Sequence, residues 1–336
     1  MLRRSTPLLV VACALVLGCS SEPAGPRPRV VIIADTHVIG PQYTTPVENS
    51  PADNESILLT PMRLRALRDQ VNAMQPKPEA VFVLGDVVHA SHHSTDLAWY
   101  DANRNAYTEA REIFAGFDMP VHVVMGNHDY EMTCGHETYP KALSEELFRH
   151  FFGAEPYYAV EVGGFRFYLL NGQQGPSWDP AGAGCDTEIA SFGAAQLGWL
   201  ARELDDGKPS VVMSHYMSIL WAADENPGVA GQDDLRAVIR THRNVLMALA
   251  GHTHRWLDFT GLSTGNSHLP HFVLGPARYD PDNFWTLELD RETGTLTIVD
   301  KDKAIWSSTC STTYRYDGDP APGGGDAAGT CVSGPG

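Results

Sequence analysis

Basic residues are scarce in this chain of 336 residues. Lys and Arg number 24 against 41 Asp and Glu, the formal net charge is −17, and no Lys/Arg-rich run exists. Such a surface repels nucleic acid and acidic membranes unless positive charge is concentrated locally. We therefore expect no nucleic-acid partner. A negative protein can still act on phosphate if bound cations reverse the charge inside one cleft, and the 14 histidines could serve as their ligands.

Long apolar stretches are also missing, except at the N-terminus. Residues 7–18 are apolar but too few to span a bilayer as a mature helix, and basic residues precede them. Cys19 follows directly, where the lipobox of bacterial lipoproteins has its lipidated cysteine. We expect a signal peptide at 1–18 and a lipidated tether at 19–28. This predicts an exported protein, anchored to a membrane of the bacterial cell envelope on its periplasmic or outer-membrane side. The alternative is a plain secretory signal cut elsewhere.

Cysteine is sparse, and no C-x-x-C spacing occurs. After removal of the signal and lipidation of Cys19, the mature chain retains four cysteines. An even number in an exported protein favours disulfides over metal-binding thiolates. Four cysteines allow three pairings, between which the sequence cannot choose. Our expectation is Cys134–Cys185, joining two loops, and Cys310–Cys331, near the C-terminus.

Internal repeats are absent, and residues 29–316 read as one domain. Residues 317–336 are rich in Gly, Pro and Asp, which predicts a disordered tail. Helical patterns alternate with short apolar runs rich in Val and Ile, which suit strands buried on both faces. Later strands come in pairs without helices between them. This order predicts an α/β fold of packed sheets with helices outside. The apolar runs are 30–34, 80–84, 121–125, 210–213 and 245–249.

Each apolar run ends in a polar motif. Side chains beyond the carboxyl ends of strands form the ligand sites of α/β sheets. One such motif occurs often by chance, but five in order, each directly after a buried strand, are a strong signal. In chain order the motifs are Asp35-Thr36-His37, Gly85-Asp86, Gly126-Asn127-His128-Asp129, Ser214-His215 and Gly251-His252-Thr253-His254.

This ordered set resembles the calcineurin-like metallophosphoesterases over roughly residues 29–300. Residues 151–171 and 196–204 are similar to the cyclic-nucleotide-phosphodiesterase-like branch. The resemblance implies a four-layer αββα sandwich, with two mixed β-sheets flanked by helices and a dinuclear metal centre at the strand ends. It implies His128 as the catalytic residue that faces the substrate. It also implies the metal ligands, which are Asp35, His37 and His254 for the first ion, Asn127, His215 and His252 for the second, and Asp86 between them.

The resemblance predicts a metal-dependent phosphoric ester hydrolase. Two divalent cations about 3.5–4 Å apart lower the pKa of a bridging water, and its hydroxide attacks phosphorus in line. The ligand types suit Mn, Fe or Zn. We expect a phosphodiester of a small molecule as substrate, with phosphomonoesters as the alternative. A non-catalytic binding protein usually loses a ligand or the substrate-facing His, whereas every such position is filled here. A nuclease would need a basic groove.

At His89 the sequence differs from two subfamilies of the metallophosphoesterases that it resembles. It stands where protein serine/threonine phosphatases have an Asp that orients the substrate-facing His, and where purple acid phosphatases have an iron-ligating Tyr. Both activities are therefore disfavoured, and the partner of His128 stays open. His89 either contacts the substrate phosphate or lines the rim of the site. We expect His92 and His93 to be solvated and Asp129 to support the centre without binding a metal. For three rim aromatics, stacking on a base or sugar is possible, but ordinary packing is expected: Trp99, Tyr130 and Trp178.

Overall fold

The computed structural model describes residues 27–135, 139–222, 234–260 and 269–299, with the backbone of 313–316 and 329–331. The predicted signal peptide, the lipidation site and the side chains of the expected Cys310–Cys331 pair lie outside the described residues. No helix in the described ranges is long and apolar enough to cross a membrane.

Seven strands form the first sheet, in the order β13-β12-β11-β10-β1-β2-β3. Its strands β1 to β3 are parallel, and the others pair antiparallel, so the sheet is mixed. β13 lies inside the stretch 317–336, for which the sequence predicts a disordered tail. An edge strand pairs through its backbone and needs no apolar sequence pattern. The bounds are β1 (Arg29–Ile33), β2 (Ala80–Val83), β3 (Val121–Val123), β10 (Phe284–Asp290), β11 (Thr295–Ile298), β12 (Thr313–Tyr316) and β13 (Gly329–Cys331).

Six strands form the second sheet, in the order β4-β5-β6-β7-β9-β8. The four central strands β5, β6, β7 and β9 are parallel, and β4 and β8 are antiparallel edges. Gly163 and Gly164 form the β4–β5 turn with positive φ, as tight hairpin turns require. The bounds are β4 (Tyr158–Val162), β5 (Phe165–Leu170), β6 (Ser210–Ser214), β7 (Val245–Ala250), β8 (Leu257–Asp258) and β9 (His271–Val273).

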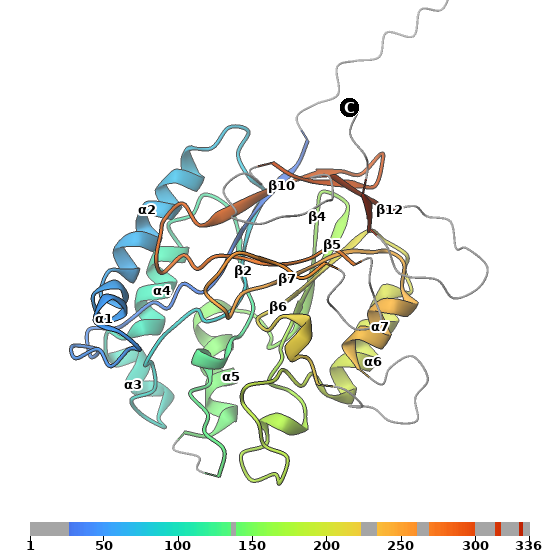
Figure 1. The fold of residues 1–336 in the computed structure, drawn as a ribbon. Coiled ribbons are helices and arrows are strands. Elements are labelled where there is room, and N and C mark those ends of the chain that lie inside the picture. The colour runs from blue at the N-terminus through green and yellow to red at the C-terminus, as the bar shows by residue number, and fades with distance from the viewer. Residues whose placement is uncertain are drawn as a thin grey trace, which may run out of the picture.

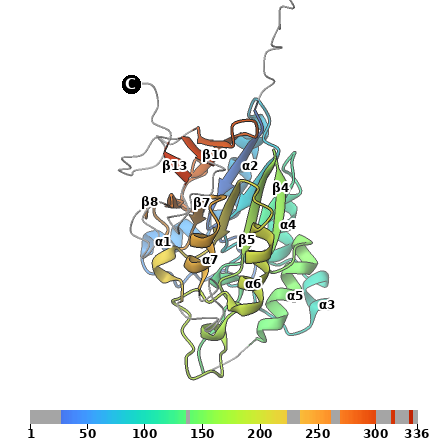
Figure 2. The ribbon, with the colours of Figure 1, turned by 90° about the vertical axis from the view of Figure 1, so that its right-hand side faces the viewer.

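Helices cover the outer faces of both sheets. Figure 1 shows α2 and α4 on one side of the molecule and α6 and α7 on the other, with the strands between them. The view turned by 90° faces the side of the molecule that carries α6 and α7 (Figure 2). The four-layer αββα sandwich expected from the sequence is therefore present. The bounds are α1 (Pro51–Ile57), α2 (Thr60–Ala73), α3 (Leu97–Ala102), α4 (Ala106–Phe114), α5 (Lys141–Phe152), α6 (Gly193–Leu204) and α7 (Leu235–Thr241).

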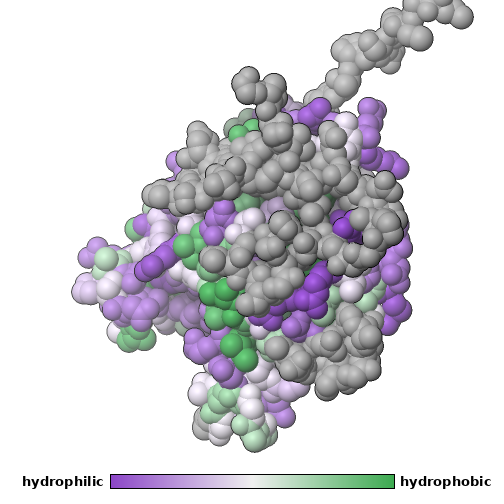
Figure 3. All heavy atoms as spheres, turned by 45° about the vertical axis from the view of Figure 1, so that its right-hand side comes forward, coloured by the Kyte–Doolittle hydropathy of each residue, from purple (hydrophilic) through white to green (hydrophobic). Residues whose placement is uncertain are grey.

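Alternation along the strands divides the core into two. In β1, Val30 and Ile32 belong to the core between the sheets, whereas Val31 belongs to the core under the helices. Phe82 of β2 stacks on Phe167 of β5 across the inter-sheet layer, with ring centroids 4.6 Å apart. Both faces of the strands are buried, which explains their continuous apolar sequence. On the surface, hydrophilic residues cover most of the described part of the face in Figure 3.

Candidate metal centre

The carboxyl ends of β1, β2, β3, β6 and β7 bring the predicted ligands together, and most of these ligands have a strained backbone. Among the described residues, seven non-glycine residues have positive φ, a conformation that costs energy for side chains with a Cβ. Such strain persists where the surrounding structure imposes it, and it gathers at functional sites. Five of the seven are predicted metal ligands: Asp35, His37, Asp86, His252 and His254.

Two glycines let the strand ends approach each other closely. Gly85 has a φ of +86°, and a Cβ there would lie 2.5 Å from Nδ1 of His215. A Cβ on Gly126 would collide with the side chain of Asp86. Larger residues at these two positions would therefore push predicted ligands out of place.

The ligands predicted for the first ion converge on one point. Nε2 of His37 lies 2.9 Å from Nε2 of His254 and 3.3 Å from Oδ2 of Asp86. Asp35 accepts the backbone N–H of His252 at Oδ1 (2.9 Å), whereas its buried Oδ2 has no hydrogen-bond partner among the described residues. The ligand atoms of the four predicted residues lie within 4.8 Å of one another. An orphaned carboxylate oxygen beside facing imidazole nitrogens fits a cation.

The ligands predicted for the second ion converge beside the first set. Oδ1 of Asn127 lies 3.0 Å from Nε2 of His215 and 3.1 Å from Nδ1 of His252. Nε2 of His215 is also 3.2 Å from Oδ2 of Asp86, so that one oxygen faces both sets. Nδ1 of His215 lies 2.8 Å from the carbonyl oxygen of Leu84. A donor bond there leaves the Nε2 lone pair of the neutral ring free for a metal.

Burial keeps most of these imidazoles neutral. It lowers the pKa of His37 well below the usual range, that of His252 to about 3 and that of His254 to about 4. Burial also lowers the pKa of His215, but the carboxylate of Asp86 opposes it, and the net pKa is about 9. A metal ion replaces such a proton when it binds. The protonation states therefore fit two cations on either side of one carboxylate.

Asp129 holds the loops that carry the ligands. Its carboxylate accepts backbone N–H groups from Gly126 (2.7 Å), Val88 (3.0 Å) and Val87 (3.3 Å). The loops after β2 and β3 are thereby joined directly beside Asp86. Burial raises the pKa of Asp129 to about 7. Every oxygen of this carboxylate is used by the backbone, which agrees with a supporting role.

His128 and His89 form the wall of the centre. The two rings stack with centroids 4.8 Å apart, and the His128 ring meets the edge of His37 at the same distance. The backbone N–H of His128 donates to Oδ1 of Asp86 (2.9 Å). The structure shows the surroundings of His89, which could not be predicted from the sequence. Its ring is almost buried between His37 and Glu48, and together with His37 and His128 it forms a second cluster of nitrogen ligand atoms.

A pocket of about 400 Å³ opens beside this wall. Glu48, Tyr43 and Asp53 come to it from the segment between β1 and α2, and Arg278 and Tyr279 from the loop between β9 and β10. Sequence patterns did not reveal these residues, because no motif marks them. They lie near the strand ends only through tertiary contacts such as the Glu48–Arg278 ion pair (3.1 Å). His128, His89 and His254 complete the side of the pocket that faces the centre.

Among the rim residues with an expectation from the sequence, one is placed differently and three are placed as expected. His92 was expected to be solvated, but it is buried, with Nε2 2.9 Å from Oγ of Ser144. The prediction was wrong because α5 covers this loop. Tyr130 and Trp178 are buried in the core, as ordinary packing predicts, and Trp99 packs against it.

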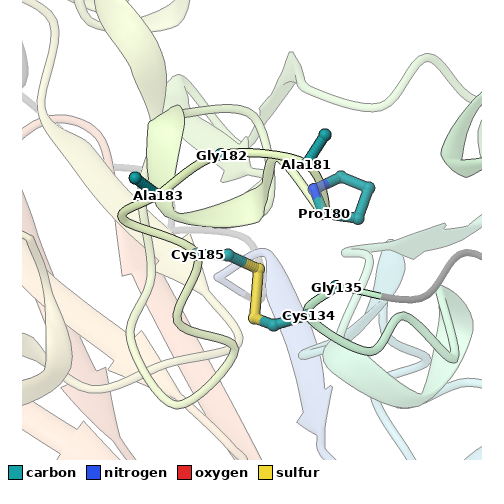
Figure 4. Close-up of a pocket in the computed structure, with 7 residues that line it drawn as sticks. All are labelled: Cys134, Gly135, Pro180, Ala181, Gly182, Ala183 and Cys185. Atoms are coloured by element: carbon teal, nitrogen blue, oxygen red, sulfur yellow. A yellow bond between two sulfur atoms is a disulfide. The ribbon is translucent and has the colours of Figure 1, made fainter.

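The loops around 134 and 185 are joined at a distance from the ligands. Cys134 and Cys185 form a disulfide, as expected, with Cα atoms 5.7 Å apart. Figure 4 shows the hollow beside it, lined by Gly135, Pro180 and small neighbouring residues. Apart from the bonded cysteines, no titratable side chain among the described residues lines this hollow.

Comparisons with known proteins agree with this geometry. The model of the family described as calcineurin-like phosphoesterase matches residues 28–256. The chain is 25% identical over 236 residues to a human protein, the manganese-dependent ADP-ribose/CDP-alcohol diphosphatase. The aligned residues cover 57% of this chain and 68% of the human protein. A dimetal phosphatase from Danio rerio has a similar fold, with a TM-score of 0.52, 20% identity, and coverage of 82% of this chain and 96% of that chain.

Proposed function

The chain belongs to the calcineurin-like phosphoesterase family, and from this premise we propose that it hydrolyses small molecules in which a phosphate or a diphosphate joins two organic groups. Phosphodiesters and diphosphates linking two alcohols both fit this description. The single observation that supports a dinuclear centre best is Oδ2 of Asp86, which lies 3.3 Å from Nε2 of His37 and 3.2 Å from Nε2 of His215. One carboxylate oxygen thus faces both ligand sets.

In this proposal the predicted ligands keep their assigned roles. Two bound divalent cations would supply Lewis-acid stabilisation of the phosphoryl oxygens and lower the pKa of a water molecule. Asp86 offsets the repulsion between the two positive charges. The first ion is held by Asp35, His37 and His254, and the second by Asn127, His215 and His252. Their identity as manganese, iron or zinc is a matter for measurement, and the name of the human relative makes manganese the first to test.

His128 carries out the proton transfer in the proposed reaction. A bond forms between phosphorus and the oxygen of water, which loses one proton to the solvent, and the bond between phosphorus and the leaving oxygen breaks. The alkoxide that leaves a phosphodiester needs a proton, which the protonated ring of His128 can deliver from the wall of the pocket and regain from the solvent. The phosphate that leaves a diphosphate is stable without this proton. Stacking on His89 and the backbone bond to Asp86 fix the position of the His128 ring.

The adjoining pocket supports a small substrate with a second organic group. About 400 Å³ beside the centre can hold a sugar, an alcohol or part of a nucleoside, with Tyr43 and Tyr279 among its lining residues. The human relative is named for ADP-ribose and CDP-alcohols, in which diphosphate joins two organic groups. A phosphomonoester has only one organic group, without the second one found in the substrates of the human relative's name. Phosphatase activity on monoesters is therefore the second candidate.

The test compares hydrolysis of bis-p-nitrophenyl phosphate, ADP-ribose and p-nitrophenyl phosphate by manganese-loaded protein. We expect the first two to be cleaved, and we expect Asp86→Ala and His128→Ala to lower the rate by at least about 100-fold. Cleavage of the monoester alone would favour the phosphatase. Loss of activity in His128→Ala with retained manganese would separate its role from that of the ligands. Protein that binds no metal would overturn the proposal.

We also propose, from the sequence, that a lipid on Cys19 anchors the protein to a membrane. If the chain is processed as a lipoprotein, mass spectrometry of the mature N-terminus will find an acylated Cys19. An unmodified N-terminus at another residue would instead indicate a plain secretory signal.

A further inference from the structure

Arg278 is the only Lys or Arg among the described residues that line the pocket beside the centre. Its backbone N–H donates to the carbonyl oxygen of Asp35 (3.1 Å), and its Nη2 donates to Oε2 of Glu48 (3.1 Å). The guanidinium also lies over the ring of Tyr279, with Cζ 5.1 Å from the ring centroid. Arg278 is only 3% exposed. These contacts hold the guanidinium in one position in the pocket wall.

The guanidinium of Arg278 has hydrogen-bonding capacity that the protein does not use. Its Nε is a buried donor with no hydrogen-bond partner among the described residues. A buried donor without a partner is costly, so this one indicates a ligand that accepts from it. The planar guanidinium presents its donors as a fork, which matches two oxygens of a phosphate group. The chemistry of Arg278 therefore favours a phosphate as its partner.

The charges around the pocket decide how Arg278 can bind a phosphate. Glu48 cancels the charge of Arg278, and two more carboxylates line the pocket, those of Asp53 and Glu131. Arg278 alone therefore does not attract an anion, and the affinity has to come from cations at the centre. His254, a predicted ligand of the first ion, lines the same pocket. When the centre binds one phosphate of a diphosphate, the second phosphate is attached beside it, and Arg278 only has to orient this group.

We propose that Arg278 is a catalytic residue that binds the second phosphate of a diphosphate substrate, so that the enzyme prefers diphosphates to phosphodiesters with a single phosphate. This proposal rests on the proposed function and narrows it. In the reaction, the oxygen of water forms a bond to the phosphorus at the centre and loses one proton to the solvent. The bond between this phosphorus and the bridging oxygen breaks, and its electron pair stays on the leaving phosphate. Arg278 stabilises the negative charge that gathers there.

Arg278→Lys and Arg278→Gln test the proposal with two substrates. Lys keeps the charge without the fork, and Gln removes both. Since a hydrogen bond to a charged group is lost, we expect kcat/KM for ADP-ribose to fall about 10–100-fold in both variants. Bis-p-nitrophenyl phosphate has a single phosphate, and we expect its kcat/KM to stay near the wild-type value. Manganese content shows whether the centre is intact in each variant.

Binding gives a second readout, which does not depend on turnover. In α,β-methylene-ADP a carbon joins the two phosphorus atoms and prevents hydrolysis of the bridge, whereas AMP has only one phosphate. Isothermal titration of manganese-loaded protein measures the affinity for both. We expect Arg278→Gln to weaken binding of α,β-methylene-ADP about 10–100-fold and to leave binding of AMP unchanged.

Arg63→Gln is the matched control for a purely structural effect. Nη1 of Arg63 donates to the carbonyl oxygen of Arg278 (2.6 Å), but Arg63 does not line the pocket. This variant loosens the loop that carries Arg278 and leaves the guanidinium in place. We expect any loss of kcat/KM in Arg63→Gln to be the same for ADP-ribose and bis-p-nitrophenyl phosphate.

The role of Arg278 is refuted if its two variants keep the hydrolysis of ADP-ribose, or lose that of both substrates by the same factor. It is also refuted if Arg63→Gln shows the selective loss. These results are distinct from failure of the proposed function. Wild-type protein that binds manganese but cleaves neither substrate rejects that function, and equal affinities of the wild type and Arg278→Gln for α,β-methylene-ADP reject the role of Arg278.

Discussion

Replacing Gly85 by alanine should damage the centre although no predicted ligand is changed. Gly85 has a φ of +86°, and the new Cβ would lie 2.5 Å from Nδ1 of His215. A left-handed conformation costs a residue with a Cβ about 1–2 kcal/mol. Displacing the imidazole also breaks its hydrogen bond to the carbonyl of Leu84, which costs about 1 kcal/mol more. We expect the free energy of unfolding of metal-free protein to fall by about 2–3 kcal/mol.

Gly207→Ala separates the two contributions. Gly207 has a φ of +70°, but no atom lies within 4 Å of a Cβ placed there. This variant therefore has only the conformational cost of about 1–2 kcal/mol. Urea unfolding compares the stabilities, and manganese content with diester hydrolysis compares the centres. Only Gly85→Ala should lose manganese from the ion held by His215 and lose at least about 10-fold in activity. Equal stability, metal content and activity in the two variants would refute the close-approach explanation.

Two further predictions concern buried carboxylates. Burial raises the pKa of Glu109, but hydrogen bonds from Arg65 and Arg104 outweigh it and hold this pKa below the usual 4.5. The stabilisation is present above pH 4.5 and is lost as the pH falls through the lower native pKa. Glu109→Gln should therefore cost about 1 kcal/mol at pH 7 and flatten the acid decline of stability in urea titrations. Asp129→Asn replaces one of the two oxygens that accept three backbone N–H groups with a donor, and we expect the free energy of unfolding to fall by about 1–3 kcal/mol, together with reduced manganese binding. Unchanged unfolding curves would contradict both.

The layered fold was predictable because its central strands are buried on both faces. Runs such as 80–84 and 245–249 are apolar without interruption, and this pattern needs no knowledge of partners. The short strands β8 and β9 were not predicted. β8 has only two residues, and β9 contains the buried His271, so neither has a distinctive periodicity.

The convergence of the proposed ligands could also be predicted, because each follows a predictable strand directly. The pocket could not. Glu48 and Arg278 are 230 residues apart in sequence and meet only in the folded chain. Glu48 lies in a polar loop, where acidic residues are common, and the local sequence does not distinguish it from Glu55. The function of His89 was open for the same reason, since its two partners come from other loops.

The charge of the pocket leads to a last prediction. Glu48, Asp53 and Glu131 all line it, and Arg278 forms an ion pair with Glu48 (3.1 Å). With a net charge of −17 on the chain, this one guanidinium cannot make the pocket attractive to phosphate. Affinity for phosphate esters must therefore come from cations at the centre. Isothermal titration with inorganic phosphate should detect binding to manganese-loaded protein and none after treatment with a chelator. Equal affinity in the two states would mean that protein groups alone bind the phosphate, and the account of the negative pocket would be wrong.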